Sequence, residues 1–209
     1  MRGTQRGPTR GSVLEWREEE GYVVRIFART GLVVALVLLG VGHAVAQTAT
    51  LSGDLVTDWQ QQKRTMIAIA EAMPESAFSF KPTEAQRTYA EQILHIAGAN
   101  VYLMQHLGGT AAAPDVDTTD FKVFGLPATS KAVVLEALGA GYDYGIAVLQ
   151  ELSDDQLLET IAGPSSMGNV TRAKMAYFTL SHAMDIYGQM VVYLRLNDVT
   201  PPASRRGGV

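Results

Sequence analysis

Apolar residues recur at three- and four-residue steps along most of the chain beyond residue 50, and this spacing predicts amphipathic helices. Four such segments stand out, at about residues 51–73, 83–107, 130–152 and 171–197. Pro74 follows the first segment and Gly108-Gly109 the second, and both are residues that end helices. Four long helices joined by ordinary loops predict an all-α protein with the architecture of a four-helix bundle.

The segments between the helices carry weaker patterns. Thr83-Glu84-Ala85-Gln86 fits a capping box and predicts that the second helix begins at Thr83. Phe78 and Phe80 alternate in the connector 74–82, which is typical of a short extended piece. Residues 109–128 and 153–169 are predicted to be loops, the second with one short turn at about 155–161.

The first 46 residues carry the parts of a secretory signal rather than part of the fold. Gly31 to Ala46 is a short apolar run that follows Arg25 and Arg29, and it ends in Ala44-Val45-Ala46, a signal-peptidase site. At about 16 residues it is shorter than a membrane-spanning helix. We therefore expect cleavage before Gln47 and a protein exported to the periplasm or the medium, with an uncleaved anchor as the alternative.

The domain boundaries follow from this signal. Residues 1–22 are unlike the start of a signal, and a translation start at Val23 or Val24 would give it ordinary proportions. The expected organisation is an extension and signal over 1–46, a bundle over 47–198 and a polar tail over 199–209. The membrane is then a partner only of the signal before its cleavage.

Composition excludes several classes of function. Residues 47–209 carry 11 basic and 17 acidic side chains, a net charge of −6, which argues against nucleic acid as a partner. The chain has no cysteine, so disulfides, thiol catalysis and cysteine-ligated zinc are excluded. The sequence carries no phosphate loop or dinucleotide fingerprint, and no convincing Ser-His-Asp arrangement.

Three histidines remain outside the signal. His95 lies in the middle of the second predicted helix and His182 in the middle of the fourth, both among core-like residues. A single core histidine is usually just hydrogen-bonded, but facing helices of bundles also build metal sites from inward side chains. His106 lies about three turns from His95, too far to share an ion, and is expected at the helix end.

Three segments of the mature chain carry a family resemblance. They read MPESAFSFKPTEAQRTYAEQILHIAGANVYLM, then SKAVVLEALGAGYDY, then LSHAMDIYGQMVVYLRLNDVTPPASR. This pattern resembles the DinB-like superfamily, the DinB/YfiT type of four-helix bundle, and within it an exported bacterial branch. The similarity extends from about Trp59 to Arg205.

The resemblance implies both a fold and a chemistry. DinB-like proteins are four-helix bundles, often dimeric, and many bind a divalent metal, usually zinc or nickel, through three histidines. Some relatives are thiol-dependent transferases, and many are assigned as metal-dependent hydrolases without a known substrate. A homodimer and a small-molecule substrate or ligand are therefore the partners that the resemblance implies.

The metal-ligand pattern of the family is carried over only in part. His95 matches the ligand of the second helix and His182 the first ligand of the fourth, but the third position is Ile186. Asp185, three residues after His182, could complete the set, although relatives place an acidic residue there beside their third histidine. We expect a metal-dependent hydrolase or transferase with a partly degenerate site; the alternative is a non-catalytic bundle that binds a small molecule or protein.

Overall fold

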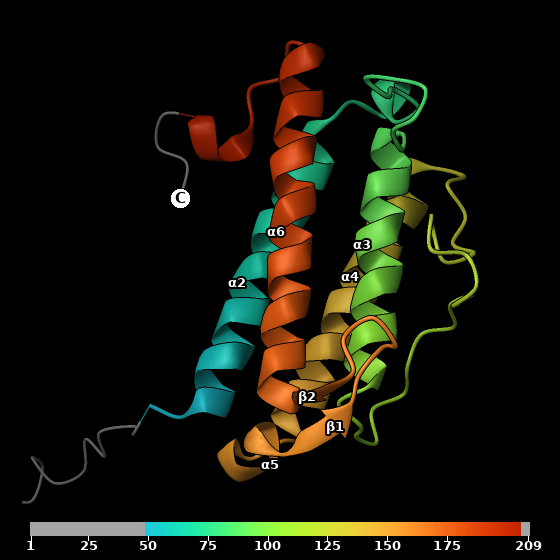
Figure 1. Cartoon of the computed structure of the whole chain (residues 1–209). Helices are drawn as coiled ribbons and strands as arrows, with labels where there is room; N and C mark the ends of the chain where they lie inside the picture. Colours follow the sequence, from blue (N-terminus) through green and yellow to red (C-terminus); the bar gives the residue numbers. More distant parts are fainter. Residues whose placement is uncertain (1–48, 206–209) are drawn as a thin grey trace, which may run out of the picture. The chain divides into compact units, whose positions relative to one another are not determined.

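Four long helices form the body of the protein in the computed structural model, which describes residues 49–205 (Figure 1). They are α2 (Leu51–Ala72), α3 (Tyr89–Gln105), α4 (Lys131–Gln150) and α6 (Arg172–Leu196). α2 and α3 each pack against both α4 and α6, so the four helices form a bundle in which α2 and α3 are one diagonal pair. The predicted helical bundle is confirmed, and the signal segment lies outside the described residues.

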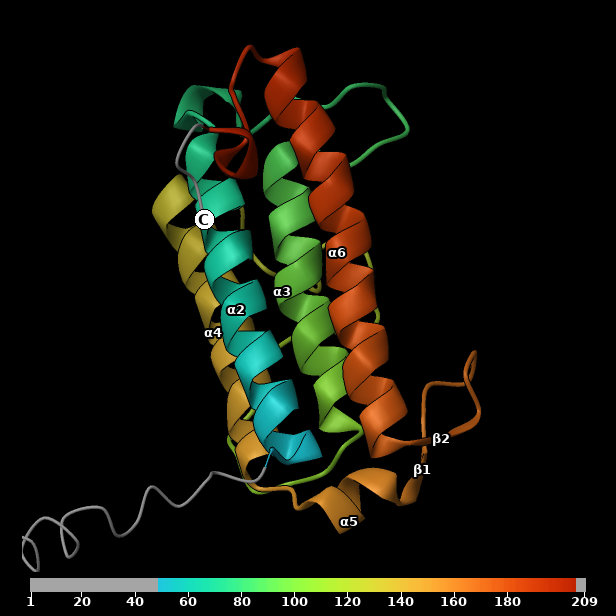
Figure 2. The ribbon, with the colours of Figure 1, turned by 90° about the vertical axis from the view of Figure 1, so that its left-hand side faces the viewer.

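Contacts between helix ends define the direction of each helix. Lys131 at the start of α4 donates to the carbonyl of Met73 at the end of α2, and Tyr193 near the end of α6 donates to the carbonyl of Arg87 just before α3. Tyr89 at the start of α3 also donates to the carbonyl of Ile69 near the end of α2, so α2 and α6 run one way and α3 and α4 the other. Because α3 and α4 are parallel, residues 106–130 return along the outside of the bundle as a long crossover (Figures 1 and 2).

The predicted start of α3 is wrong by six residues. The helix begins at Tyr89, and its capping box joins Thr88 to Glu91 rather than Thr83 to Gln86. Thr88 Oγ1 accepts from the backbone N–H of Glu91, whose carboxylate accepts from the N–H of Thr88. Both tetrads satisfy the sequence rule, but only the later one places Tyr89 in the core, where its hydroxyl donates to the carbonyl of Ile69.

The connectors contain more regular structure than the sequence predicts. Residues 75–77 form the short 3₁₀ helix η1 (Glu75–Ala77), not an extended piece. The second predicted loop contains α5 (Asp154–Leu158) and a hairpin of β1 (Thr160–Ala162) and β2 (Asn169–Thr171), which pair antiparallel with Ile161 opposite Val170. The polar tail begins with a second 3₁₀ helix, η2 (Pro202–Ser204).

One continuous hydrophobic core runs through the bundle. α3 is buried over most of its length because α4, α6 and the crossover cover it, whereas α2 and α6 each keep an exposed face. Among the described residues, α4 is a helix long and apolar enough to cross a membrane, with a mean hydropathy of 1.4, and 44% of its most apolar stretch is buried. α4 packs against α2 and α3.

Candidate functional site

His95 and His182 meet between α3 and α6. Their Nε2 atoms lie 3.1 Å apart, and His95 is buried whereas His182 is partly buried. The structure thus brings these two candidate residues together, and their role as metal ligands stays a prediction. His106 is at the far end of α3, where its Nδ1 lies 3.2 Å from the carbonyl oxygen of Ala162, and it takes no part in the pair.

The tautomers of the pair follow from the neighbouring acceptor. His95 Nδ1 lies 2.8 Å from the carbonyl oxygen of Phe121, and a carbonyl only accepts, so Nδ1 carries the proton. His95 Nε2 is then an acceptor, and His182 Nε2 donates to it. This arrangement leaves His182 Nδ1 as a lone pair, buried and without a hydrogen-bond partner.

Both histidines are held neutral. Burial is the main cause that lowers the pKa of His95 to about 4, and the nearby positive charge of Arg87 lowers it further. Burial also lowers the pKa of His182, although Asp185 acts in the opposite direction. The pair therefore offers neutral imidazoles at neutral pH, the protonation state that binds metals and accepts hydrogen bonds.

A turn in the crossover holds the Phe121 carbonyl in place. The Asp120 carboxylate accepts from the backbone N–H groups of Lys122 and Gly125, and the backbone of Phe124 bonds to that of Asp117 and Asp120. Phe124 has a positive φ of 56° and is buried against α3. We call residues 120–125 the strap, because they cross α3 beside His95.

Gly98 makes the strap possible. A Cβ at this position would lie 2.3 Å from both Cβ and Cγ of Phe124, so only glycine allows the ring to approach α3 this closely. Gly98 is three residues after His95 and therefore on the same side of the helix. The glycine and the histidine together fix the strap, which in turn sets the orientation of the imidazole.

The two remaining predicted ligand positions differ in their surroundings. Ile186 is 3% exposed and packs in the core, so the third histidine position of the family is filled by an apolar side chain. Asp185 is exposed and accepts from Gln189 Nε2 at 3.0 Å. Among residues 49–205, no three His, Cys, Asp or Glu side chains are grouped closely enough to hold a metal ion.

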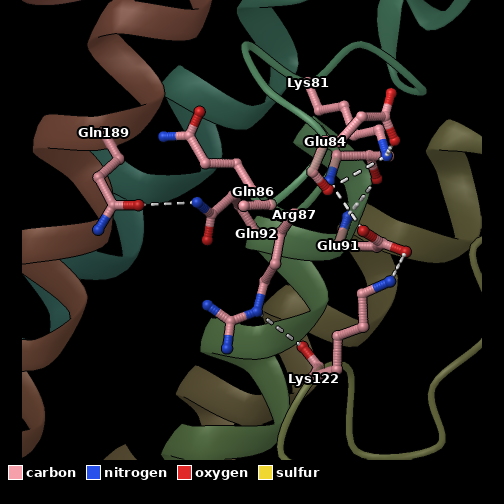
Figure 3. A pocket seen from close by; sticks show the side chains of 10 residues that line it. Lys81, Glu84, Gln86, Arg87, Glu91, Gln92, Lys122 and Gln189 are labelled. Atoms are coloured by element: carbon pink, nitrogen blue, oxygen red, sulfur yellow. Dashed lines mark hydrogen bonds and ion pairs between the residues drawn. The ribbon is translucent and has the colours of Figure 1, made fainter.

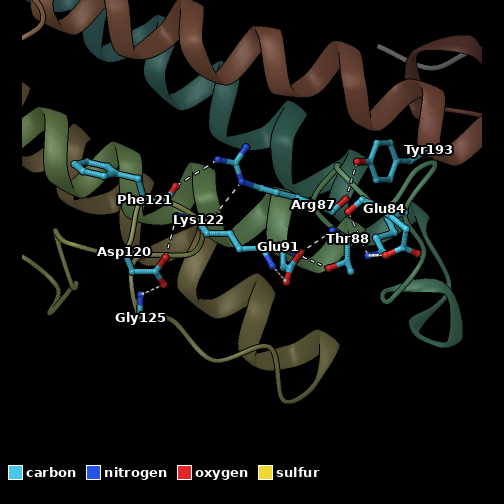
Figure 4. Close-up of polar contacts among 10 residues, drawn as sticks. Glu84, Arg87, Thr88, Glu91, Asp120, Phe121, Lys122, Gly125 and Tyr193 are labelled. Atoms are coloured by element: carbon cyan, nitrogen blue, oxygen red, sulfur yellow. Dashed lines mark hydrogen bonds and ion pairs between the residues drawn. The ribbon is translucent and has the colours of Figure 1, made fainter.

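Polar residues that the sequence did not single out extend the site toward the start of α3. Arg87 donates from Nε and Nη2 to the carbonyls of Lys122 and Phe121, so it shares the Phe121 oxygen with His95 (Figure 4). Gln92, one turn before His95, donates to Gln189 Oε1 across the gap to α6. The helical spacing could have indicated Gln92, but the strap carbonyls leave no signal in the sequence.

The fold and the histidine pair define a helical bundle with a polar site between its second and fourth long helices, α3 and α6. The family model of the DinB superfamily matches residues 58–190, and this chain belongs to that superfamily. The predicted family is thereby confirmed. Comparison with curated proteins gives no match.

Two solved structures are similar in fold. One is a DinB-like protein from Bacillus cereus ATCC 10987, 17% identical, with a TM-score of 0.61 over 73% of this chain and 96% of that one. The other is the DinB-like protein YjoA from Bacillus subtilis, 18% identical, with a TM-score of 0.53 over 70% of this chain and 93% of that one. At these identities the likeness concerns the fold alone.

Proposed function

We propose that this DinB-like protein binds a divalent metal ion, zinc or nickel, through His95 and His182 and acts on a small molecule as a hydrolase or transferase. The observation that carries the proposal is the 3.1 Å separation of the two Nε2 atoms. Two nitrogen ligands of a tetrahedral ion at about 2.0–2.1 Å lie roughly 3.3 Å apart. The pair could therefore close on one ion with a shift of a few tenths of an ångström.

The hydrogen bond from His95 Nδ1 to Phe121 supports the same proposal. Metal-ligating histidines usually donate their second N–H to a carbonyl or carboxylate, which aims the Nε2 lone pair at the ion. His182 has no such acceptor, since its Nδ1 is buried without a partner. With Ile186 in place of a third ligand, we expect weak and exchangeable binding.

The chemistry that such an ion supplies is Lewis-acid polarisation of an electrophile. The protein's own contribution is to orient the imidazoles and to shield them from solvent. His95 stays neutral because it is buried, the Phe121 carbonyl holds its ring, and the strap covers one side of the pair. Arg87 donates to the same Phe121 carbonyl as His95, which links the pair to the polar residues at the start of α3.

The proposal includes export, since the signal over Gly31–Ala46 predicts a periplasmic or secreted protein. The test is the N-terminal sequence of the protein from the extracytoplasmic fraction of cells that express the full chain. We expect it to begin at Gln47. Retention of residues 31–46 on a membrane-bound protein would instead support an uncleaved anchor.

A non-catalytic binding bundle is the second candidate, and the burial of Ile186 favours it. An isoleucine at 3% exposure contributes to the core and removes a ligand position at the same time. The bundle would then bind a small molecule or a protein segment without a metal ion. Under this alternative His95 and His182 are only hydrogen-bonded to each other.

Bound metal, measured by mass spectrometry on protein expressed as the full chain without a histidine tag, decides between the two candidates. We expect a metal content that falls in His182→Ala and rises toward one ion per chain in Ile186→His, which restores a third ligand. His106→Ala is the matched control, because this histidine lies outside the pair, and it should equal the wild type. If the wild type contains no metal and only Ile186→His binds an ion, the result would support the non-catalytic binding bundle.

A further inference from the structure

A pocket of about 590 Å³ opens at the start of α3, between the connector that precedes α3, the strap and α6 (Figure 3). Its walls are polar and carry the side chains of two lysines, one arginine, two glutamates and three glutamines, namely Lys81, Lys122, Arg87, Glu84, Glu91, Gln86, Gln92 and Gln189. The volume is typical of sites for small molecules. The lining indicates a polar ligand rather than an apolar one.

The three cations of this pocket have different partners. Lys81 lies 2.6 Å from Glu84, and Lys122 lies 2.6 Å from Glu91, so each lysine has a carboxylate of its own. Among the described residues, no carboxylate pairs with Arg87. Arg87 is therefore the cation in the pocket whose charge remains available to a ligand.

The guanidinium of Arg87 is oriented by the strap. Nε and Nη2 donate to the carbonyls of Lys122 and Phe121 at 3.2 and 3.3 Å, which fixes the plane of the group. A guanidinium carries five N–H groups, so donors remain on the end formed by Nη1 and Nη2. Two parallel N–H groups on a planar fork match the two oxygens of a carboxylate.

Gln92 provides an independent sign of a missing ligand. Its side chain is 2% exposed and lines the pocket, and its Oε1 has no hydrogen-bond partner. Its Nε2 already donates to Gln189, so the orientation of the amide is fixed. A buried acceptor without a donor is costly, and a hydroxyl or ammonium group of a ligand would satisfy it.

We propose that this pocket binds a small organic carboxylate that also carries a hydroxyl or amino group, with Arg87 holding the carboxylate and Gln92 Oε1 accepting from the donor. This inference rests on the proposed function, since it names the class of substrate of the same site. Neither histidine lines the pocket, but the Phe121 oxygen accepts from both Arg87 and His95, so one carbonyl links the pocket to the histidine pair.

Calorimetric titration of the full-length chain, stripped of metal by a chelator, tests the inference. Glycolate and acetate are the probes, because they share a carboxylate and differ by one hydroxyl. We expect saturable binding of glycolate and about threefold or more weaker binding of acetate, the value of one hydrogen bond. Inorganic phosphate is the competing anion and should bind more weakly than glycolate.

The variants locate the binding. Arg87→Gln should weaken glycolate binding about tenfold or more, because it removes a charge-assisted pair of hydrogen bonds. Arg87→Lys keeps the charge but lacks the planar pair of N–H donors, so its affinity for glycolate should lie between those of the wild type and Arg87→Gln. Lys63→Gln is the control: it removes a cation outside the pocket, one paired with Asp143, and should stay within about twofold of the wild type.

Several outcomes would overturn the inference. They are the absence of saturable glycolate binding by the wild type, equal losses in Arg87→Gln and Lys63→Gln, or tighter binding of phosphate than of glycolate. Far-ultraviolet circular dichroism establishes that each variant is folded, and Arg87→Lys remains informative if Arg87→Gln is not. The titration uses metal-free protein, so the absence of glycolate binding would leave the metal proposal standing. Conversely, a protein that binds no metal could still bind glycolate.

Discussion

Gly145 and Gly98 accommodate aromatic rings in the same way but in two different regions. A Cβ at Gly145 of α4 would lie 2.3 Å from the ring of Trp59, and one at Gly98 of α3 would lie 2.3 Å from Phe124. Trp59 belongs to α2, is fully buried and meets Tyr142 edge to face. Phe124 belongs to the strap, outside the bundle.

The difference lies in what each ring holds. Trp59 joins two helices, so the contact with Gly145 contributes to the cohesion of α2 and α4 and to the stability of the core. Phe124 fixes a loop whose neighbours present carbonyls to His95 and Arg87. The same close approach therefore stabilises the fold in one region and positions the candidate site in the other.

Gly145→Ala should have the largest effect on stability. The added methyl meets a buried ring between two helices that cannot easily separate, and overpacking of this kind costs about 1–3 kcal/mol. Chemical denaturation measures the loss. Gly139→Ala on the same helix is the control, since a Cβ there meets nothing within 4 Å, and it should stabilise the protein by up to about 1 kcal/mol.

Gly98→Ala should cost less stability but should disturb the site. The strap can move away from α3 as a loop, so we expect a loss of about 1 kcal/mol. His95 Nδ1 would then lose the Phe121 carbonyl, and losing such an orienting partner lowers metal affinity by about 10–100-fold. Competition with a chelator measures the metal affinity, and Gly188→Ala on α6 is the control, because a Cβ there meets nothing within 4 Å. An unchanged affinity in Gly98→Ala would contradict the role of the strap.

The stability of the metal-free protein should depend on pH through His95. Its pKa is about 4 in the folded protein and about 6.5 in the unfolded chain. Between these values only the unfolded state binds the proton, so the stability present above pH 6.5 is lost as the pH falls toward 4. Denaturation at several pH values should show a flatter slope of stability against pH for His95→Gln than for the wild type, and equal slopes would contradict this role of His95.

Asp143→Asn should have the smallest effect. Asp143 on α4 pairs with Lys63 on α2 at 2.6 Å, close to the Trp59 region, but its side chain is 65% exposed. Exposed ion pairs contribute about 0.2–1 kcal/mol, so denaturation should detect a loss at or below that range. A larger loss would show that surface charge, and not only the aromatic contact, joins α2 to α4.

The sequence predicted the four long helices well because their apolar stripes are continuous. The ends of α2, α4 and α6 agree with the prediction to within a few residues. The start of α3 was wrong because Thr83 and Thr88 both satisfy the capping pattern, and only the burial of Tyr89 favours the second. The hairpin of β1 and β2 was not predicted, because strands of three residues are too short to show an alternation of apolar and polar positions.

The site was predicted only as far as its helical residues. His95 and His182 could be paired because each lies in the middle of a buried helix, and bundles bring such positions together. Gln92 could have been added from its helical spacing, but Arg87 and Phe121 could not. Both lie outside α3, and the Phe121 contact is made by a backbone oxygen that any residue would supply.

The sequence alone determined the helical class, the apolar stripes, the superfamily and the two histidines of the candidate site. These features depend on the spacing of apolar and motif residues along the chain, which can be read from the sequence itself. The tertiary structure decided that the crossover turns back over α3, that Gly98 admits Phe124 and that Arg87 has no carboxylate partner among the described residues. Such contacts join residues far apart in the chain, and their geometry follows from packing and hydrogen bonding that no local pattern encodes.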